Sequence, residues 1–325
     1  MTLPYGAERA LQQFESDREP NPHPVRRFRK PWPRGTFPLL MFFLTVWSTI
    51  WVGTLAWVPE LLFEAFQTGS AHTLRRCILA NWSTGLQFSA SLLTILLAHE
   101  FGHYLMMRRY GNVSTYPIFI PFPVSPFGTC GALIVMDPSY ANRREIFDIG
   151  IAGPLAGLVI AIPLAMVGLL FPAGPPLPQP DSLRIGQPLV MYILDSLLGT
   201  ELISGIATQQ VNTSSPIFMA AWIGFLITGL NMMPMSQLDG GHVAFGIFGK
   251  YSEWIAKSVF VAVVAYMIYV QMMFFILMLF LILMMGLKHP PSSDDSQRLG
   301  LGRTLLGLIA LTIPILCIPA TPFQI

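Results

Sequence analysis

Charged residues are scarce in this sequence. Only 11% of its 325 residues are Asp, Glu, Lys or Arg, whereas 53% are hydrophobic. Soluble domains carry about 25% charged residues, so the composition argues strongly against a soluble globular protein. The same hydrophobicity argues against intrinsic disorder. The formal net charge of +2, without a basic repeat or stripe, excludes nucleic acid as an expected partner.

Cysteine is scarce as well. Cys77, Cys130 and Cys317 are too few and too scattered for a disulfide framework or a CxxC metal site. Residues 1–36 also lack the apolar segment of a cleaved signal peptide, and they hold seven Lys or Arg residues. They are therefore predicted to form a cytosolic tail that leads into a membrane anchor.

Long stretches without an ionisable side chain are the main feature of the rest of the chain. They are the length of bilayer spans, because ~20 apolar residues in a helix cross ~30 Å of hydrocarbon. We therefore predict an all-α polytopic membrane protein with about six transmembrane helices. The expected spans are 37–57, about 81–107, 149–171, 216–233, the stretch 258–287, which is compatible with one helix or two, and 304–322.

One cluster of ionisable residues interrupts these apolar spans. The sequence His99-Glu100-Phe101-Gly102-His103 stands at the predicted cytosolic end of the second span. Two histidines four residues apart share one face of a helix and can reach one metal ion. Glu100 lies on the adjacent flank, where it can take a proton from a metal-activated water. A mere helix end at the membrane interface is the less favoured interpretation, because ionisable groups in apolar helices are costly and usually functional.

A third metal ligand is expected elsewhere, since hydrolytic zinc sites normally have three protein ligands and one open position. Asp239 is favoured, because it lies between Pro234, which ends the fourth span, and two glycines that permit a tight turn. The second and fourth spans run in the same direction, which brings Asp239 to the depth of the two histidines. The competing ligand is His242, and the runners-up are Asp148 and Glu145.

These motifs resemble the site-2 protease family of intramembrane zinc metalloproteases. The resemblance rests on HExxH in one span, on N-x-x-P followed by Asp-Gly at 231–240, and on a Gly-Pro-containing helix between them at 152–157. It implies a zinc metalloendopeptidase that hydrolyses membrane-spanning protein or peptide substrates within or near the bilayer, by means of a zinc-activated water. The residues that it implies are His99, His103 and Asp239 as ligands of one Zn²⁺, Glu100 as the catalytic base and Asn231 beside the substrate backbone.

The organisation that follows has four parts. Residues 1–36 are the cytosolic tail, 37–80 the first anchor with an outer loop, 81–257 the catalytic core and 258–325 the C-terminal transmembrane helices. Lys and Arg are more frequent in the tail and in the loop after the second span, and cytosolic loops are enriched in them. We therefore predict an integral multi-pass membrane protein with a cytosolic N-terminus, a site near the cytosolic leaflet and the lipid bilayer as its surroundings.

A charge-free segment at 115–136 lies between the second and third spans. Four prolines rule out a regular helix there, and Gly128 and Gly131 favour a turn. We expect an extended hairpin that dips into the membrane beside the site. Its edge near Gly131 is predicted to bind an unwound substrate by strand addition. A passive hydrophobic loop on the bilayer is the alternative.

Two further patterns are interpreted as structural. Gly150, Gly153 and Gly157 give the third span a small-residue face, whose expected role is close helix packing. The polar stretch that begins at His289 and includes Asp294 and Asp295 is interpreted as a loop rather than a second metal site.

Two rival functions remain as alternatives to the protease. A membrane metal-ion transporter would need ligands distributed through the depth of the membrane, whereas the ligands here collect at one leaflet. A catalytically silent membrane scaffold would be expected to lack Glu100 or a zinc ligand, and this sequence has all four residues.

Overall fold

The structure is a computed structural model in which most of the chain after Gly35 is described. The predicted tail and most of the predicted outer loop, at 1–34 and 56–71, lie outside the described residues. The described residues are 35–55, 72–112, 114–125, 127–134, 141–171, 184–200, 203, 208–210, 215–235, 237–270, 276–287, 289, 292–295 and 297–324.

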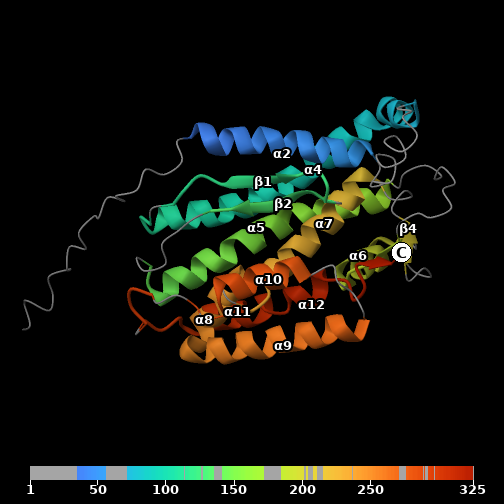
Figure 1. Cartoon of the computed structure of the whole chain (residues 1–325). Coiled ribbons are helices and arrows are strands. Elements are labelled where there is room, and N and C mark those ends of the chain that lie inside the picture. The colour runs from blue at the N-terminus through green and yellow to red at the C-terminus, as the bar shows by residue number, and fades with distance from the viewer. Residues whose placement is uncertain are drawn as a thin grey trace, which may run out of the picture. The chain divides into compact units, whose positions relative to one another are not determined.

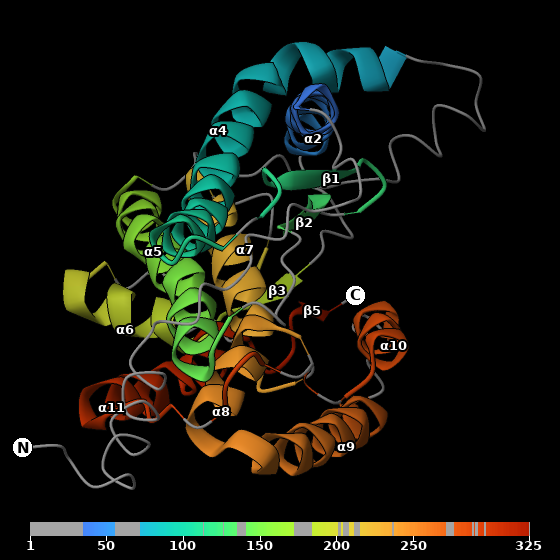
Figure 2. The same cartoon turned by 90° about the vertical axis from the view of Figure 1, so that its left-hand side faces the viewer.

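Helices make up most of the described chain, as predicted; four of them, α4, α5, α7 and α8, surround the site, and α2 packs on α4. In Figures 1 and 2, α5 lies alongside α4 and also contacts α7 and α8, while α2 crosses α4. Large apolar side chains form the core between these helices, with Phe88, Phe147 and Trp222 fully buried, while α2 buries several Ser and Thr residues. The bounds are α2 Thr36–Thr54, α4 His72–Arg109, α5 Arg143–Leu170, α7 Pro216–Asn231 and α8 Asp239–Phe248.

The starts of α5 and α7 follow from local sequence signals. The Asn142 side chain accepts a hydrogen bond from the Glu145 backbone N–H, and the Glu145 carboxylate accepts one from the Asn142 N–H. This capping box satisfies backbone donors that a helix leaves free at its N-terminus. Ser215 caps α7 in a similar way, ahead of Pro216 in its first turn. Both helices therefore begin at defined residues, which sets the register of the side chains further along.

Two short strands occupy the proline-containing segment between α4 and α5. Strands β1 (Ile118–Phe122) and β2 (Gly128–Leu133) pair antiparallel, with an irregularity in the register between Phe119 and Pro121. The pair packs on α2, where the Ser48 hydroxyl donates to the Gly128 carbonyl at 2.6 Å. Gly131 lies in the irregular part with a φ of 93°, a conformation that glycine adopts without strain. Whether these strands enter a membrane stays a prediction.

In the C-terminal part, the described residues form helices α9 to α12, and the stretch 258–287 left open by the sequence includes most of α9 and all of α10, with 271–275 outside the described residues. The predicted last span at 304–322 is interrupted, because Pro314 has no N–H to offer and its ring excludes the carbonyl of Ala310, where α11 ends. A second sheet, with strand order β4-β3-β5, departs from the predicted all-α class. The remaining bounds are α6 Leu189–Leu198, η3 Gly249–Tyr251, α9 Ser252–Val270, α10 Ile276–Met285, α11 Leu301–Ala310, α12 Ile313–Cys317, β3 Arg184–Gly186, β4 Thr208–Gln210 and β5 Phe323–Gln324.

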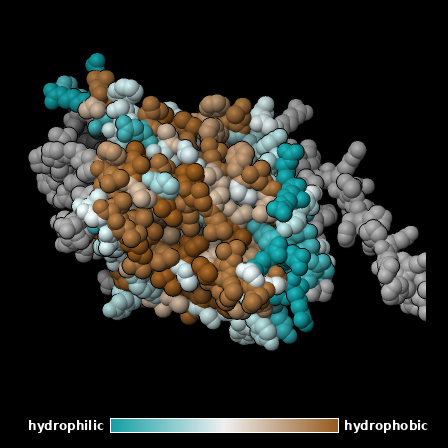
Figure 3. Space-filling model, turned by 180° about the vertical axis from the view of Figure 1, so that it is seen from behind, coloured by the Kyte–Doolittle hydropathy of each residue, from teal (hydrophilic) through white to brown (hydrophobic). Residues whose placement is uncertain are grey.

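Three stretches of the described chain are long and apolar enough to cross a membrane, namely Thr36–Thr54, Arg143–Leu170 and Asp239–Val270. Figure 3 shows a broad face covered mainly by hydrophobic side chains, with hydrophilic residues gathered toward its edges. Such a large apolar face is unfavourable in water and suits hydrocarbon. The chain is therefore a membrane protein, while the count of about six spans stays a prediction.

Candidate metal centre

Helix α4 brings two of the predicted ligands together. His99 and His103 lie one turn apart, and their Nε2 atoms are 3.2 Å from each other. Both residues are buried, with 3% and 8% of their surface exposed. The helical spacing alone accounts for this pairing, because side chains at i and i+4 share one face.

The third predicted ligand, Asp239, is the first residue of α8. Its Oδ2 lies 3.1 Å from Nε2 of His99 and 3.3 Å from Nε2 of His103. The turn after α7 carries it there, and Gly240 makes the turn feasible: a Cβ at Gly240 would lie 2.0 Å from the Met232 carbonyl oxygen. The structure thus brings together three side chains that are up to 140 positions apart in sequence.

These three side chains fit a zinc ion. Among the described residues they form a group whose ligand atoms all lie within 4.8 Å of one another. The three distances between Nε2, Nε2 and Oδ2 are 3.1, 3.2 and 3.3 Å. Zinc bonds of ~2.0–2.1 Å in a tetrahedron give ligand-to-ligand distances of about 3.3–3.4 Å. The spacing of the ligand atoms is therefore close to that of three corners of a tetrahedral site.

The hydrogen bond of His103 supports the same conclusion. Its Nδ1–H donates to the Ile149 carbonyl oxygen at 2.8 Å, and a carbonyl can only accept. In the neutral ring, Nε2 therefore carries a lone pair, which faces the acceptor oxygen of Asp239. Two acceptors at 3.3 Å repel each other unless a cation or an added proton lies between them. A backbone carbonyl on the second ring nitrogen is also the usual orienting partner of a metal-binding histidine.

The small-residue face of α5 lies directly against the two histidines. A Cβ at Gly153 would lie 2.1 Å from Nε2 of His103, and one at Gly157 would lie 3.3 Å from Nδ1 of His99. Gly150 similarly adjoins His242 on α8, at 2.7 Å from its Cβ. The predicted role in close packing is confirmed, and the packed partners are the imidazoles themselves. The glycines give the rings room to converge.

The alternative ligands are engaged in other contacts. His242 turns to His289, with 2.8 Å between its Nδ1 and the His289 Nε2. Asp148 accepts two hydrogen bonds from Arg303, at 2.8 and 2.9 Å, and one from the Tyr110 hydroxyl. Glu145 belongs to the capping box of α5. None of these three alternative ligands belongs to the group formed by His99, His103 and Asp239.

Of the other predicted site residues, Glu100 and Asn231 lie beside the cluster, whereas Gly131 lies in the strand pair. Glu100 is 6% exposed and directly follows His99 on α4. Asn231 ends α7 with its Nδ2 3.5 Å from Nε2 of His99, so its amide adjoins the cluster. Gly131 belongs to the strand pair, where its N–H donates to the Thr129 hydroxyl at 3.0 Å. Apart from Gly131 and its chain neighbours, no described residue has an atom within 4 Å of the place that a Cβ would take at Gly131.

His289 is a residue near the site that the sequence interpretation missed. It was assigned to a polar loop, yet it is 8% exposed and its ring stacks on Phe245 of α8 at 4.1 Å. A lone histidine ahead of two prolines carries no periodic signal, so only the contact with α8 reveals it.

Comparisons with known proteins find relatives that are named as zinc metalloproteases. The chain is 30% identical over 224 residues to "Probable zinc metalloprotease EGY1, chloroplastic" of Oryza sativa subsp. japonica, a match that covers 65% of this chain and 38% of the relative. It is 31% identical over 160 residues to "Probable zinc metalloprotease EGY2, chloroplastic" of Arabidopsis thaliana, covering 48% and 27%. The Arabidopsis EGY1 protein is 29% identical over 225 residues, covering 65% and 39%.

The chain thus spans less than two fifths of the length of these relatives. No solved structure matches it. Residues 87–279, which make up more than half of the chain and include the whole His99, His103 and Asp239 cluster, match the profile of Peptidase family M50. This protein therefore belongs to Peptidase family M50, the family of site-2 proteases.

Proposed function

We propose that the protein is an intramembrane zinc metalloprotease that cuts peptide bonds of membrane-spanning proteins or peptides. The observation that carries this proposal is the convergence of His99, His103 and Asp239 within 4.8 Å, with Glu100 buried next to them. In this proposal, the three converging side chains hold one zinc ion and leave one position open toward the substrate. The names of the relatives, which call them zinc metalloproteases, support the same metal and reaction.

The chemistry requires a base beside the metal ligands. A zinc ion, when bound, supplies Lewis acidity, which makes water nucleophilic near neutral pH and polarises a carbonyl. The Glu100 carboxylate takes the proton of the attacking water as the water oxygen bonds to the scissile carbon. Glu100 then delivers this proton to the leaving nitrogen, so that a carboxyl and an amino end are released. Because Glu100 directly follows a ligand on the same helix, its carboxylate stays close to the reacting atoms.

Asn231 is proposed to bind the substrate backbone. Its amide lies 3.5 Å from Nε2 of His99, at the end of α7. A side-chain amide offers both donor and acceptor atoms to a peptide group. The substrate must be unwound locally, since an intact helix satisfies its own carbonyls and hides them from attack.

Strand β2 is proposed to hold the unwound substrate by strand addition. It pairs with β1 on one edge, no other described strand pairs with its second edge, and among the described residues nothing occupies the place of a Cβ at Gly131. An extended peptide on the free edge would gain backbone hydrogen bonds and present its scissile bond in extended form. In this proposal the strand pair dips into the membrane close to the metal centre.

The bilayer is proposed to surround the helices with the N-terminal tail in the cytosol. Arg108 and Arg109 end α4 shortly after His103, which favours the cytosolic leaflet as the location of the site. The multi-pass arrangement with about six spans belongs to the same proposal.

The metal-ion transporter has less support, because in the described part of the chain the possible metal ligands gather in one group. The scaffold has less support because Glu100 and all three ligands are present.

Metal content tests the proposal without a known substrate. We expect about one zinc per chain in the detergent-purified protein by elemental mass spectrometry, and loss of zinc in His99→Ala and Asp239→Ala. His72→Ala, at an exposed position in the first turn of the same helix, is the matched control and should keep its zinc. Zinc retained in Asp239→Ala would reject the three-ligand assignment. A wild-type protein without zinc would contradict the protease and favour the scaffold.

Gly131→Pro tests the strand-addition step. Proline holds φ near −65° and lacks an N–H, whereas Gly131 has a φ of 93° and donates to the Thr129 hydroxyl. We expect cleavage of a labelled single-span peptide to slow by about 10- to 100-fold, because the scissile bond is misplaced. Zinc content should stay at the wild-type level.

Val124→Ala provides the matched control for the strand pair. Val124 lies in the exposed turn between β1 and β2, so its truncation should leave turnover unchanged. Unchanged turnover in Gly131→Pro would reject strand addition and favour a passive loop on the bilayer.

A further inference from the structure

His289 and His242 form a second pair of histidines close to the metal centre. The two nitrogens are 2.8 Å apart, and the rings meet edge to face with 4.9 Å between their centroids. The His289 ring also stacks on Phe245, with 4.1 Å between the ring centroids and 1° between the ring planes. His242 and Phe245 are three residues apart on α8, and His242 is itself three residues after Asp239. His289 therefore contacts two residues of α8, the helix whose first residue is the predicted metal ligand Asp239.

His289 belongs to a segment that also crosses the start of α5. We call the described residues between 286 and 303 the strap. The Ser293 N–H donates to the Ala141 carbonyl at 3.0 Å, and the Arg143 N–H donates to the Asp294 carbonyl at 3.1 Å. Arg303 completes the connection through its two hydrogen bonds to Asp148 of α5. The strap is thus bound to both helices that position the metal centre, α5 and α8.

The first turn of α8 is held by close packing on two sides. Gly150 of α5 adjoins it so closely that a Cβ there would lie 3.2 Å from the Asp239 carbonyl oxygen. Gly240 lies against the carbonyl of Met232 at the end of α7. These contacts determine how closely α8 approaches α5 and the end of α7. Contacts between backbone surfaces resist rotation of a helix about its axis less than a side-chain hydrogen bond does. Arg143 of α5 supplies such hydrogen bonds at the far end of α8, to the Gly246 and Ile247 carbonyls, and the His242–His289 contact supplies one a single turn from Asp239.

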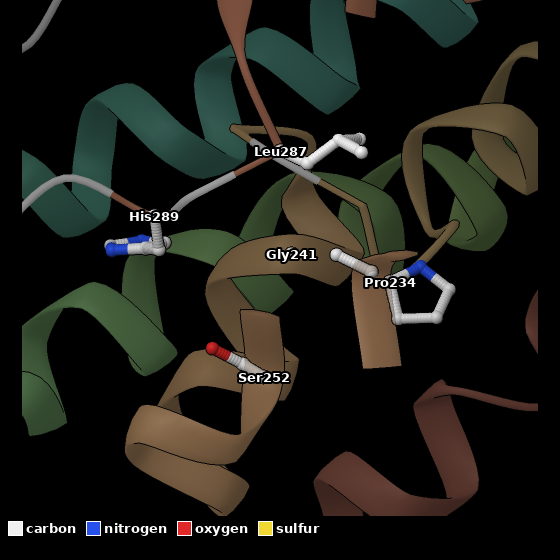
Figure 4. A pocket seen from close by; sticks show the side chains of 6 residues that line it. Pro234, Gly241, Ser252, Leu287 and His289 are labelled. Carbon is white, nitrogen blue, oxygen red and sulfur yellow. The ribbon is translucent and has the colours of Figure 1, made fainter. Parts of the chain in front are cut away.

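His289 also lines a small pocket beside α8. Figure 4 shows His289 and Leu287 on one wall of a pocket beside Gly241 of α8. Removal of the imidazole would enlarge this pocket and leave α8 free to turn toward it. A ligand displaced by ~1 Å is enough to impair a site of this kind. The complete lining is Pro234, Gly241, Ser252, Ala256, Leu287 and His289.

We propose that His289 is a positioning residue for the metal centre: through His242 and Phe245 it fixes the rotation of α8 and thereby holds the Asp239 carboxylate in the three-ligand cluster. This inference rests on the proposed function, because it concerns the same metal site. It gives the strap a specific role, which is to position α8 relative to the other metal-binding helix. Residues that do not bind a metal but orient its ligands change the affinity of other metal sites for the metal.

The test measures metal binding by the full-length chain in detergent, with Co²⁺ as the probe. We expect His289→Ala and His289→Phe to weaken Co²⁺ binding by about 10- to 100-fold in competition with a chelator. Both should also change the visible Co²⁺ spectrum, which reports ligand geometry. His289→Phe keeps a ring for the stack on Phe245 and removes only the hydrogen bond. His289→Gln restores a hydrogen-bonding group and should recover part of the affinity.

Asp195→Ala is the control for general loss of stability. Asp195 is 2% exposed and accepts hydrogen bonds from the Thr200 hydroxyl and from the Ile203 N–H, 3.1 Å away, in the segment after α6. Its removal should lower the thermal stability and leave the Co²⁺ affinity and spectrum unchanged. Wild-type affinity and spectrum in His289→Phe and His289→Gln would overturn the inference and leave the proposed function intact. Absence of Co²⁺ binding by the wild type would instead reject the metal site itself.

Discussion

Glu100→Gln is expected to abolish peptide hydrolysis almost completely while the protein keeps its metal. Glutamine has nearly the same shape as glutamate but cannot take up a proton, so the attacking water loses its base. General acid–base groups contribute about 10²- to 10⁴-fold to catalysis, and turnover should fall by that factor. Zinc should remain because Glu100 is not one of the three side chains of the cluster. The fall is measured by mass spectrometry of the products of a single-span peptide whose helix is weakened by glycines.

The matched control is the same chemical change at an exposed position. Glu253 on α9 pairs with Lys257 at 2.8 Å and is 37% exposed. Glu253→Gln should keep full turnover, since exposed ion pairs contribute little to stability. Turnover above about one tenth of the wild-type rate in Glu100→Gln, with zinc bound, would exclude Glu100 as the base.

Gly153→Ala is expected to empty the metal site, although it adds only one methyl group. The new Cβ would lie 2.1 Å from Nε2 of His103, the nitrogen proposed to bind zinc. Normal contact distances are ~3.5–4.0 Å, so the imidazole or α5 must retreat by more than about 1 Å. Displacements of ~1 Å cost about 100-fold in rate. We expect zinc content by elemental mass spectrometry and turnover of the test peptide to fall together.

Two further glycines provide a graded series for this experiment. Gly157→Ala brings a Cβ only to 3.3 Å from the His99 ring, so a smaller loss of zinc is expected. Gly302→Ala on α11 meets no atom of another described segment within 4 Å. It should keep zinc and turnover, with slightly higher stability because alanine favours helix. Full zinc content in Gly153→Ala would show that α5 does not limit the position of His103.

The C-terminal helices illustrate where sequence patterns are weakest. Uncharged stretches indicate that a segment suits the membrane, yet they do not state where a helix begins or ends. The stretch 258–287 forms parts of two helices, and 304–322 is interrupted before Pro314. The three-stranded sheet was not predicted from any pattern, because strands of two or three residues carry too few side chains for an alternating signal.

The two histidines and Glu100 required no tertiary information. The α-helix has a fixed 3.6-residue turn, so HExxH places both imidazoles on one face wherever the helix lies. Composition also determined the membrane character, because a chain with so few charged residues has too little polar surface to face water on all sides. Both conclusions depend on properties that are local or additive along the chain.

The sequence favoured Asp239 over His242, but only the tertiary structure showed that Asp239 lies with the two histidines, that His242 contacts His289, and what the glycines of α5 contact. The two candidate ligands are three residues apart, so a small change in the rotation of α8 would exchange their roles. That rotation is determined by packing against Gly150 and by the contact with His289, 47 positions away. Contacts between distant segments depend on how whole helices dock, and no periodicity within either segment encodes them.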